Sequence, residues 1–112
     1  MTRYVPDAGD LVWLTFDPQA GREQFGRRPA LILSPRSYNS RRGLALACPI
    51  TSHKKGYPFE VVLPDENEVS GVVLADHVKS VDWRERRAKF AASASSAVLT
   101  EVREKLRPLL GL

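Results

Sequence analysis

Short runs of apolar, β-branched and aromatic residues, separated by turn residues, make up most of the chain. The run Leu11–Phe16 stops at Asp17-Pro18 and predicts a strand. Ala30–Ser34 predicts a second strand. Its first four residues are all apolar, which is typical of a strand that is buried on both faces. Leu44–Thr51 predicts a third strand. The first half of the chain is therefore expected to form a β-sheet.

The strand pattern continues beyond residue 58. Phe59–Leu63 predicts a strand, Val72–Trp83 an extended stretch that bends near Asp76-His77, and Arg87–Ala92 a last strand. Four polar segments lie between the strands and predict a long mobile loop, a helical turn, a basic loop and a tight turn: Gln19–Arg27, Ser37–Arg42, Ser52–Pro58 and Pro64–Asn67.

The C-terminal fifth of the chain has a different period. Apolar residues recur there at helical spacing and form one stripe: Leu99, Val102, Leu106, Leu109 and Leu110. Ser95 or Ser96 can cap the helix, and Gly111 stands where a helix commonly ends. The stripe predicts a helix packed on the core, since Glu101 and Glu104 disfavour an amphipathic membrane helix. A mainly β fold with a C-terminal helix, forming a small bent antiparallel barrel or sheet, is expected.

Composition narrows the picture only slightly. The 112 residues suffice for a single domain, here expected over 1–112. The net charge of +4 fits a polyanionic partner such as nucleic acid, although many small basic proteins bind none. Asp7, Asp10 and Asp17 interrupt any signal-like N-terminus, and no apolar run approaches the length of a membrane span. We therefore expect a cytoplasmic protein without a membrane segment.

Cys48 is the one cysteine of the chain. One thiol cannot form an internal disulfide or a zinc site. Its neighbours Leu44–Ala47 are apolar, so a buried structural thiol is favoured over a catalytic nucleophile. No metal site and no cofactor are expected.

Candidate chemistry lies in two polar stretches. Phosphate-binding loops, dinucleotide fingerprints, zinc motifs and nucleophile elbows are all missing from the sequence. The stretch Gly21–Pro29 contains a carboxylate, Glu23, and has an arginine just before a predicted strand. The stretch Cys48–Ser52 ends a hydrophobic strand with two hydroxyl side chains. Adjacent strand ends could bring the two stretches together as a polar notch. His53 and His77 could act as an acid–base pair on RNA, but a structural role for each is favoured.

Many short motifs, in order along almost the whole chain, resemble the MazF/PemK/Kid family of toxin endoribonucleases, and within it most closely the MazF branch. They are Arg3–Asp7, Gly9–Trp13, Phe16–Pro18, Gly21, Glu23–Gln24, Gly26, Arg28–Ala30, Leu33–Pro35, Tyr38–Asn39, Lys55–Leu63, Leu74–Asp76, Val78–Ser80 and Trp83–Arg84. Each motif alone is common, but their ordered combination is specific.

The resemblance implies an SH3-like barrel, similar to CcdB and Kid, assembled as a homodimer. It implies sequence-specific cleavage of single-stranded RNA (mRNA) without a metal, through the 2′-hydroxyl, leaving a 2′,3′-cyclic phosphate and a 5′-hydroxyl. By position, the family's essential arginine falls on Arg28, its essential threonine on Thr51 and its loop carboxylate on Glu23. The implied protein partner is an acidic, MazE-like antitoxin that competes with RNA for the same groove.

The chain also departs from part of the family. The Kid/PemK branch carries a histidine where this chain has Arg22, and an arginine where it has Leu74. The acid–base scheme of that branch therefore cannot be transferred whole. The stretch Ser52–Lys54 is variable in such proteins, which leaves the RNA preference open.

In the resulting hypothesis Arg28 binds the scissile phosphate, because a guanidinium is planar, always charged and able to hold two oxygens. Thr51 would hold a phosphate or leaving oxygen, and Glu23 is the candidate general base, since an arginine stays protonated. Seven further residues are predicted to contact RNA: Gln24, Arg27, Lys54, Lys55, Asp76, Lys79 and Arg84.

Two other functions remain open at this point. A non-enzymatic toxin is one, because the gyrase poison CcdB shares the fold and dimer without ribonuclease activity. A nucleic-acid-binding module without chemistry is the other. Cleavage of RNA by the purified protein would separate both from the ribonuclease.

Overall fold

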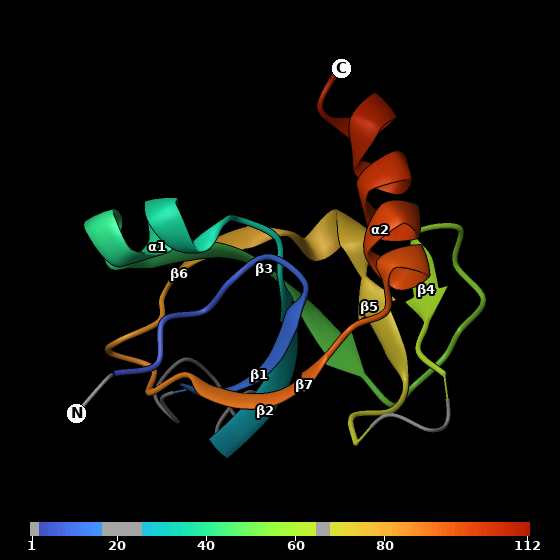
Figure 1. Ribbon diagram of the computed structural model, residues 1–112. Helices are drawn as coiled ribbons and strands as arrows, with labels where there is room; N and C mark the ends of the chain where they lie inside the picture. Colours follow the sequence, from blue (N-terminus) through green and yellow to red (C-terminus); the bar gives the residue numbers. More distant parts are fainter. Residues whose placement is uncertain (1–2, 17–25, 65–67) are drawn as a thin grey trace.

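The structure is a computed structural model and describes residues 3–16, 26–64 and 68–112 (Figure 1). Its strands follow one another in the sheet as β4-β5-β3-β2-β1-β7, and β6 pairs with β3. In chain order the elements are β1 (Asp10–Phe16), β2 (Gly26–Ile32), α1 (Arg36–Arg42), β3 (Leu44–Thr51), β4 (Glu60–Val62), β5 (Val72–Leu74), the 3-10 turn η2 (Ala75–His77), β6 (Lys79–Asp82), β7 (Lys89–Ser93) and α2 (Ser96–Leu109).

Two hydrophobic clusters lie on the two faces of the curved sheet. Leu31 of β2 belongs to a cluster with residues of β4, β5 and α2, whereas its neighbours Ala30 and Ile32 belong to a cluster with residues of β1, β3 and β6. All three side chains are at most 2% exposed. Successive side chains of a strand point to opposite faces, so the predicted burial of this strand on both faces is confirmed.

Strand β3 has the predicted bounds Leu44–Thr51 and is the centre of the sheet. It pairs with β2 on one side; on the other it pairs with β6 through Leu44–Ala47 and then with β5 through Ile50 and Thr51. The predicted extended stretch Val72–Trp83 therefore consists of two strands that share one partner. The predicted bend near Asp76-His77 is η2, which separates them.

The structure corrects several predicted element bounds. Strand β2 begins at Gly26 rather than Ala30, so the end of the predicted Gln19–Arg27 loop belongs to the sheet. The polar segment Ser37–Arg42 lies in a complete helix, α1, which stops at Gly43 with a φ of 71°. Strand β7 starts only at Lys89, because Arg87 adopts a φ of 55° in the preceding turn. Residues 17–25 and 65–67, with most of the first predicted loop and most of the Pro64–Asn67 turn, lie outside the described residues.

The prediction of a mainly β fold with a C-terminal helix is confirmed. Within the described residues the sheet is open rather than a closed barrel, since its end strands β4 and β7 do not pair with each other. Helix α2 supplies the missing cover: Val98, Val102 and Leu106 pack into the same cluster as residues of β1, β2, β4 and β5. The core is thus completed by helix-to-sheet packing.

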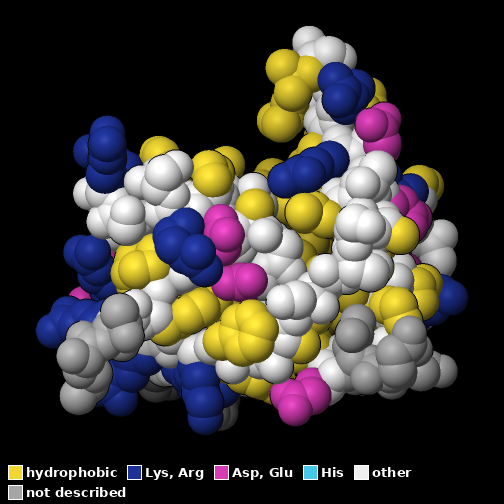
Figure 2. Space-filling model, in the orientation of Figure 1, with side chains coloured by type: hydrophobic (Ala, Val, Ile, Leu, Met, Phe, Trp, Pro, Cys, Tyr) yellow, Lys and Arg dark blue, Asp and Glu magenta, His cyan; other side chains and the backbone are white. Residues whose placement is uncertain are grey.

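Helix α2 is capped as predicted, with the Ser95 hydroxyl accepting a hydrogen bond from the amide of Val98 at 3.2 Å. Its apolar stripe is buried only in part. Val102 and Leu106 are buried, but Leu109 and Leu110 are 46% and 59% exposed, so their expected place in the core is wrong. Figures 1 and 2 show why: the last turns of α2 extend beyond the sheet and carry apolar side chains at their tip. Among the described helices, none is long and apolar enough to span a membrane.

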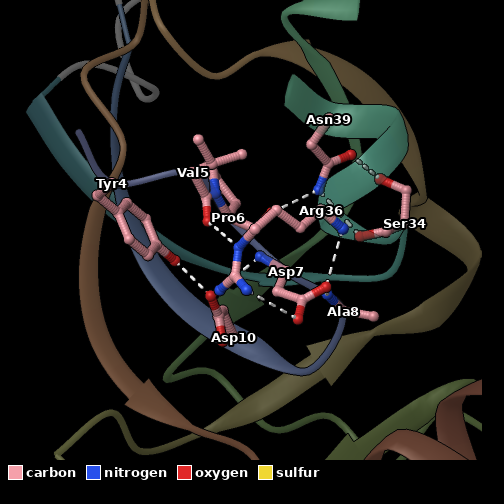
Figure 3. Close-up of polar contacts among 9 residues, drawn as sticks. All are labelled: Tyr4, Val5, Pro6, Asp7, Ala8, Asp10, Ser34, Arg36 and Asn39. Carbon is pink, nitrogen blue, oxygen red and sulfur yellow. Dashed lines mark hydrogen bonds and ion pairs between the residues drawn. The ribbon is translucent and has the colours of Figure 1, made fainter. Parts of the chain in front are cut away.

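A polar cluster ties the N-terminal segment to the start of α1 (Figure 3). The Tyr4 hydroxyl donates to Asp10 at 2.5 Å, and the backbone amide of Arg36 donates to Asp7 at 2.8 Å. The Asp7 carboxylate also accepts from the backbone amide of Ala8, and these two hydrogen bonds, that from Arg36 foremost, lower the pKa of Asp7. The buried amide of Asn39 donates to the carbonyls of Pro6 and Ser34. The cluster includes Asp10, the first residue of β1, so it stabilises the start of this strand. Arg28 lies near the other end of β1, where it pairs with Leu14.

Cys48 is fully buried in β3, as the sequence predicts for a structural thiol. Burial, with a smaller effect of the Asp76 charge, raises the pKa of the thiol to about 12. A thiol that stays protonated is a poor nucleophile, so the side chain acts as part of the core.

Candidate functional site

The pairing of β2 with β3 brings the two predicted catalytic stretches together. Ala30 pairs with Pro49 in the antiparallel ladder. Continuing this register by two residues sets Arg28 opposite Thr51, on the same face of the sheet. The predicted polar notch is therefore present, because Arg28 and Thr51 both lie just beyond the last residue pair that β2 and β3 share.

A pocket of about 200 Å³ opens at this place. Seven residues from three parts of the chain line it: Arg28, Pro29, Ile50, Thr51, Ser52, His53 and Ser70. It is smaller than the cavities of about 300–1,000 Å³ that enclose whole small-molecule ligands. It can hold a phosphodiester and the atoms next to it, while the rest of a polymeric ligand stays outside.

The Arg28 side chain is exposed at the pocket, in the N-terminal half of β2. Within the described part of the chain, its guanidinium makes no hydrogen bond and no ion pair. Five N–H donors and a permanent positive charge are therefore available to a ligand. An anion with two oxygens on one centre, such as a phosphodiester, matches this planar fork.

The Thr51 hydroxyl shapes the chain as it leaves β3. Its oxygen accepts a hydrogen bond from the backbone amide of His53 at 3.1 Å, which closes a turn at Ser52. The carboxylate of Glu60 then accepts from the amides of Lys55 and Gly56, at 3.0 and 2.9 Å, and fixes the following loop. The hydroxyl keeps its own hydrogen as a donor for a ligand, and His53 is held at the pocket wall.

A close backbone contact beside the pocket requires a glycine at position 71. Gly71 has a φ of +117°, and a Cβ on it would lie 2.2 Å from the carbonyl oxygen of Thr51. Only a residue without a side chain allows the segment before β5 to pass so near the end of β3. Gly71 thus fixes the backbone that carries Thr51.

Gly71→Ala is expected to destabilise the protein by about 1–3 kcal/mol, because the added methyl group must displace the Thr51 backbone. Chemical unfolding measures the loss. Gly56→Ala is the matched control: Gly56 has a φ of +84°, and a Cβ added to it would meet no atom within 4 Å. Equal losses for both variants would show that backbone strain alone, and not the contact with Thr51, sets the cost.

Two of the arginines predicted to contact RNA have structural partners. The Arg27 guanidinium donates to the Thr15 hydroxyl and to the carbonyls of Arg86 and Arg87, so it holds the β6–β7 turn on β1. Arg84 stacks over the Trp83 ring at 4.9 Å and donates to the carbonyl of Ser40. Neither residue lines the pocket.

The other predicted RNA contacts lie around the pocket rather than in it. Lys54 and Lys55 are exposed and directly follow His53. Asp76 is exposed on η2 beside His77, and Lys79 is exposed on β6, opposite Ala47 of β3. Glu23 and Gln24 lie outside the described residues.

Sequence reasoning missed His53 and Ser70 as pocket residues. His53 and His77 do not form the pair that was considered, because His77 lies on η2, outside the pocket. The position of His53, two residues after Thr51, could have indicated its proximity, but Ser70 follows only from the pairing of β5 with β3. In residues 3–16, 26–64 and 68–112, no group of three or more His, Cys, Asp and Glu side chains could hold a metal ion.

Comparison with known proteins identifies the family. Residues 7–110 match the family described as PemK-like, MazF-like toxin of type II toxin-antitoxin system. The chain is 49% identical to the endoribonuclease toxin MazF of Escherichia coli K12, over 99% of both chains, and 37% identical to the endoribonuclease toxin ChpB of the same strain, over 93% of both.

Solved structures agree with this result. The chain matches a crystal structure of MazE-MazF from Deinococcus radiodurans with a TM-score of 0.93 and 65% identity, covering 98% of this chain and 99% of that one. The resemblance inferred from the ordered motifs is thereby confirmed. The chain belongs to the PemK-like, MazF-like family of toxins of type II toxin–antitoxin systems.

Proposed function

We propose that this chain is a single-domain toxin, over residues 1–112, that cleaves single-stranded RNA at the Arg28–Thr51 pocket and so inhibits translation and growth. The observation that carries the proposal is the pocket itself: Arg28, whose guanidinium has no partner in the described chain, and Thr51 line the same pocket at adjacent strand ends. Endoribonuclease relatives with 49% and 37% identity support the reaction class.

The proposed reaction is an internal transesterification. The 2′-oxygen of the nucleotide attacks the adjacent phosphorus, the bond to the 5′-oxygen breaks, and the products carry a 2′,3′-cyclic phosphate and a 5′-hydroxyl. Arg28 stabilises the charge that grows on the non-bridging oxygens, and the Thr51 hydroxyl holds one of them. Glu23 is the proposed general base for the 2′-hydroxyl. No metal ion takes part.

RNA would pass over the pocket with only one phosphodiester inside it. Lys54 and Lys55 extend the positive charge next to His53 and are proposed to contact neighbouring phosphates. Contacts of Gln24, Asp76 and Lys79 with RNA, and of Arg27 and Arg84 beside their structural roles, stay predictions.

We further propose a homodimer, a MazE-like antitoxin as partner and a location in the cytoplasm. One structural relative is described as MazE-MazF, which supports the antitoxin. Exposed leucines at the end of α2, Leu109 and Leu110, offer an apolar surface for association. An acidic antitoxin segment would compete with RNA for the Arg28 guanidinium.

End mapping of the products tests the proposal. Purified protein and a set of short unstructured RNAs are incubated with EDTA in excess, and the fragment ends are identified by mass. Fragments with a 2′,3′-cyclic phosphate and a 5′-hydroxyl are expected. Fragments with a 5′-phosphate, or cleavage that needs added Mg²⁺, would contradict the mechanism. Binding without any scission would favour a module that only binds nucleic acid.

A further inference from the structure

The proposed RNA cleavage, on which this inference rests, also needs an acid that protonates the leaving 5′-oxygen. When the bond between phosphorus and the 5′-oxygen breaks, the oxygen keeps the electron pair. It leaves easily only if an acid protonates it as the bond lengthens. The acid must lie in the pocket, beside the phosphate that Arg28 holds.

The described residues that line the pocket leave few choices. The Arg28 guanidinium stays protonated throughout catalysis, and Pro29 and Ile50 have no proton to give. The hydroxyls of Thr51, Ser52 and Ser70 are alcohols and are no more acidic than the oxygen that leaves. The imidazole of His53 is the one pocket side chain of a type that gains and loses a proton between pH 5 and 8.

Backbone contacts hold His53 in place beside the phosphate site. Its own amide donates to the Thr51 hydroxyl oxygen at 3.1 Å, so the residue proposed to bind the phosphate also fixes the turn that carries the imidazole. The loop beyond it is fastened at two points: Glu60 accepts from the amides of Lys55 and Gly56, and Lys105 of α2 donates to the carbonyl of Pro58. The Glu60 carboxylate is therefore engaged in holding the loop.

Basic side chains around the pocket suit it to a phosphodiester. Arg28 lines the pocket from β2, and Lys54 and Lys55 follow His53 in its loop. A phosphodiester held by these positive charges lies beside the His53 side chain that lines the same pocket.

We propose that His53 is the general acid of RNA cleavage. Its imidazolium donates a proton to the 5′-oxygen as the bond from phosphorus to that oxygen breaks, while the general base takes the proton of the attacking 2′-hydroxyl. One proton enters the site from RNA and one leaves it on the product, so the enzyme regains its initial protonation after exchange with solvent. No water molecule and no other reactant is consumed.

A change of leaving group tests this role. In one RNA the bridging 5′-oxygen at the cut site is replaced by sulfur, which leaves as a thiolate and needs no acid. His53→Gln is expected to lower kcat/KM for the all-oxygen RNA by about 10²–10⁴. The sulfur-containing RNA should be cleaved by this variant about as fast as by the wild type. That second rate also shows that the variant is folded and binds RNA.

His77→Gln provides the matched control, since His77 lies on η2 and does not line the pocket. It should cleave both RNAs at the wild-type rate. The proposal is wrong if His53→Gln loses less than about tenfold on the all-oxygen RNA, because general acids contribute more than that. An equal loss on both RNAs, or no cleavage of either, would make His53 a structural residue instead. Failure of the proposed function looks different: the wild type itself would then cleave neither RNA.

Discussion

Arg28→Ala is expected to lower cleavage of single-stranded RNA by at least about 10²–10³ in kcat/KM, the usual cost of removing one donor aimed at developing charge. The guanidinium lines the pocket and has no partner within the described residues, so its removal breaks no contact there that holds the fold. The midpoint temperature of thermal unfolding should therefore change little. Arg28→Lys keeps the charge but not the planar fork, and should restore only part of the activity.

The matched control for this variant is Arg42→Ala. Arg42 is exposed on α1, outside the pocket, and its loss removes the same unit of charge. Rates of the two variants are compared at one ionic strength, because basic residues also attract RNA at long range. If both variants lost activity to the same extent, net charge and not phosphate binding would explain the effect of Arg28.

A single 2′-deoxy nucleotide at the cut site is expected to block cleavage there, with a fall of at least about 10⁴, because typical enzymatic rate enhancements of 10⁶ or more are lost with the nucleophile. The cut site is first mapped in an all-ribose RNA, and the substitution is then made on its 5′ side. Competition with the unmodified RNA should show that the modified strand still binds. Normal cleavage of the modified strand would mean that water attacks the phosphorus, and the internal transesterification would be excluded.

The sequence predicts the fold well wherever a pattern has a local cause. The continuous apolar run Ala30–Leu33 indicates burial on both faces, and Leu44–Thr51 matches β3 to the residue. The length of the polar helix Arg36–Arg42 is harder to predict, because nothing in its sequence pattern distinguishes one helical turn from two. Leu109 and Leu110 continue the apolar stripe of α2, but the sheet below them ends first. A period shows which face is apolar, not how far the neighbouring element extends.

The candidate site was predictable to a similar degree. Arg28 and Thr51 stand at strand ends that the sheet joins, so resemblance and geometry agree on them. The sequence does not show which of the predicted RNA-contacting side chains are instead engaged in contacts within the fold. The bonds of Arg27 to the β6–β7 turn and the stacking of Arg84 on Trp83 depend on contacts between residues far apart in the chain.

Helix α2 covers the core that β1, β2, β4 and β5 share, yet it is the last element of the fold to be translated. A nascent chain that ends before Val98 exposes this apolar surface and lacks the lysine that fastens the loop behind His53. Cleavage competence therefore arises only after α2 has been made. A ribosome making this toxin must complete this helix before the new polypeptide can attack any transcript.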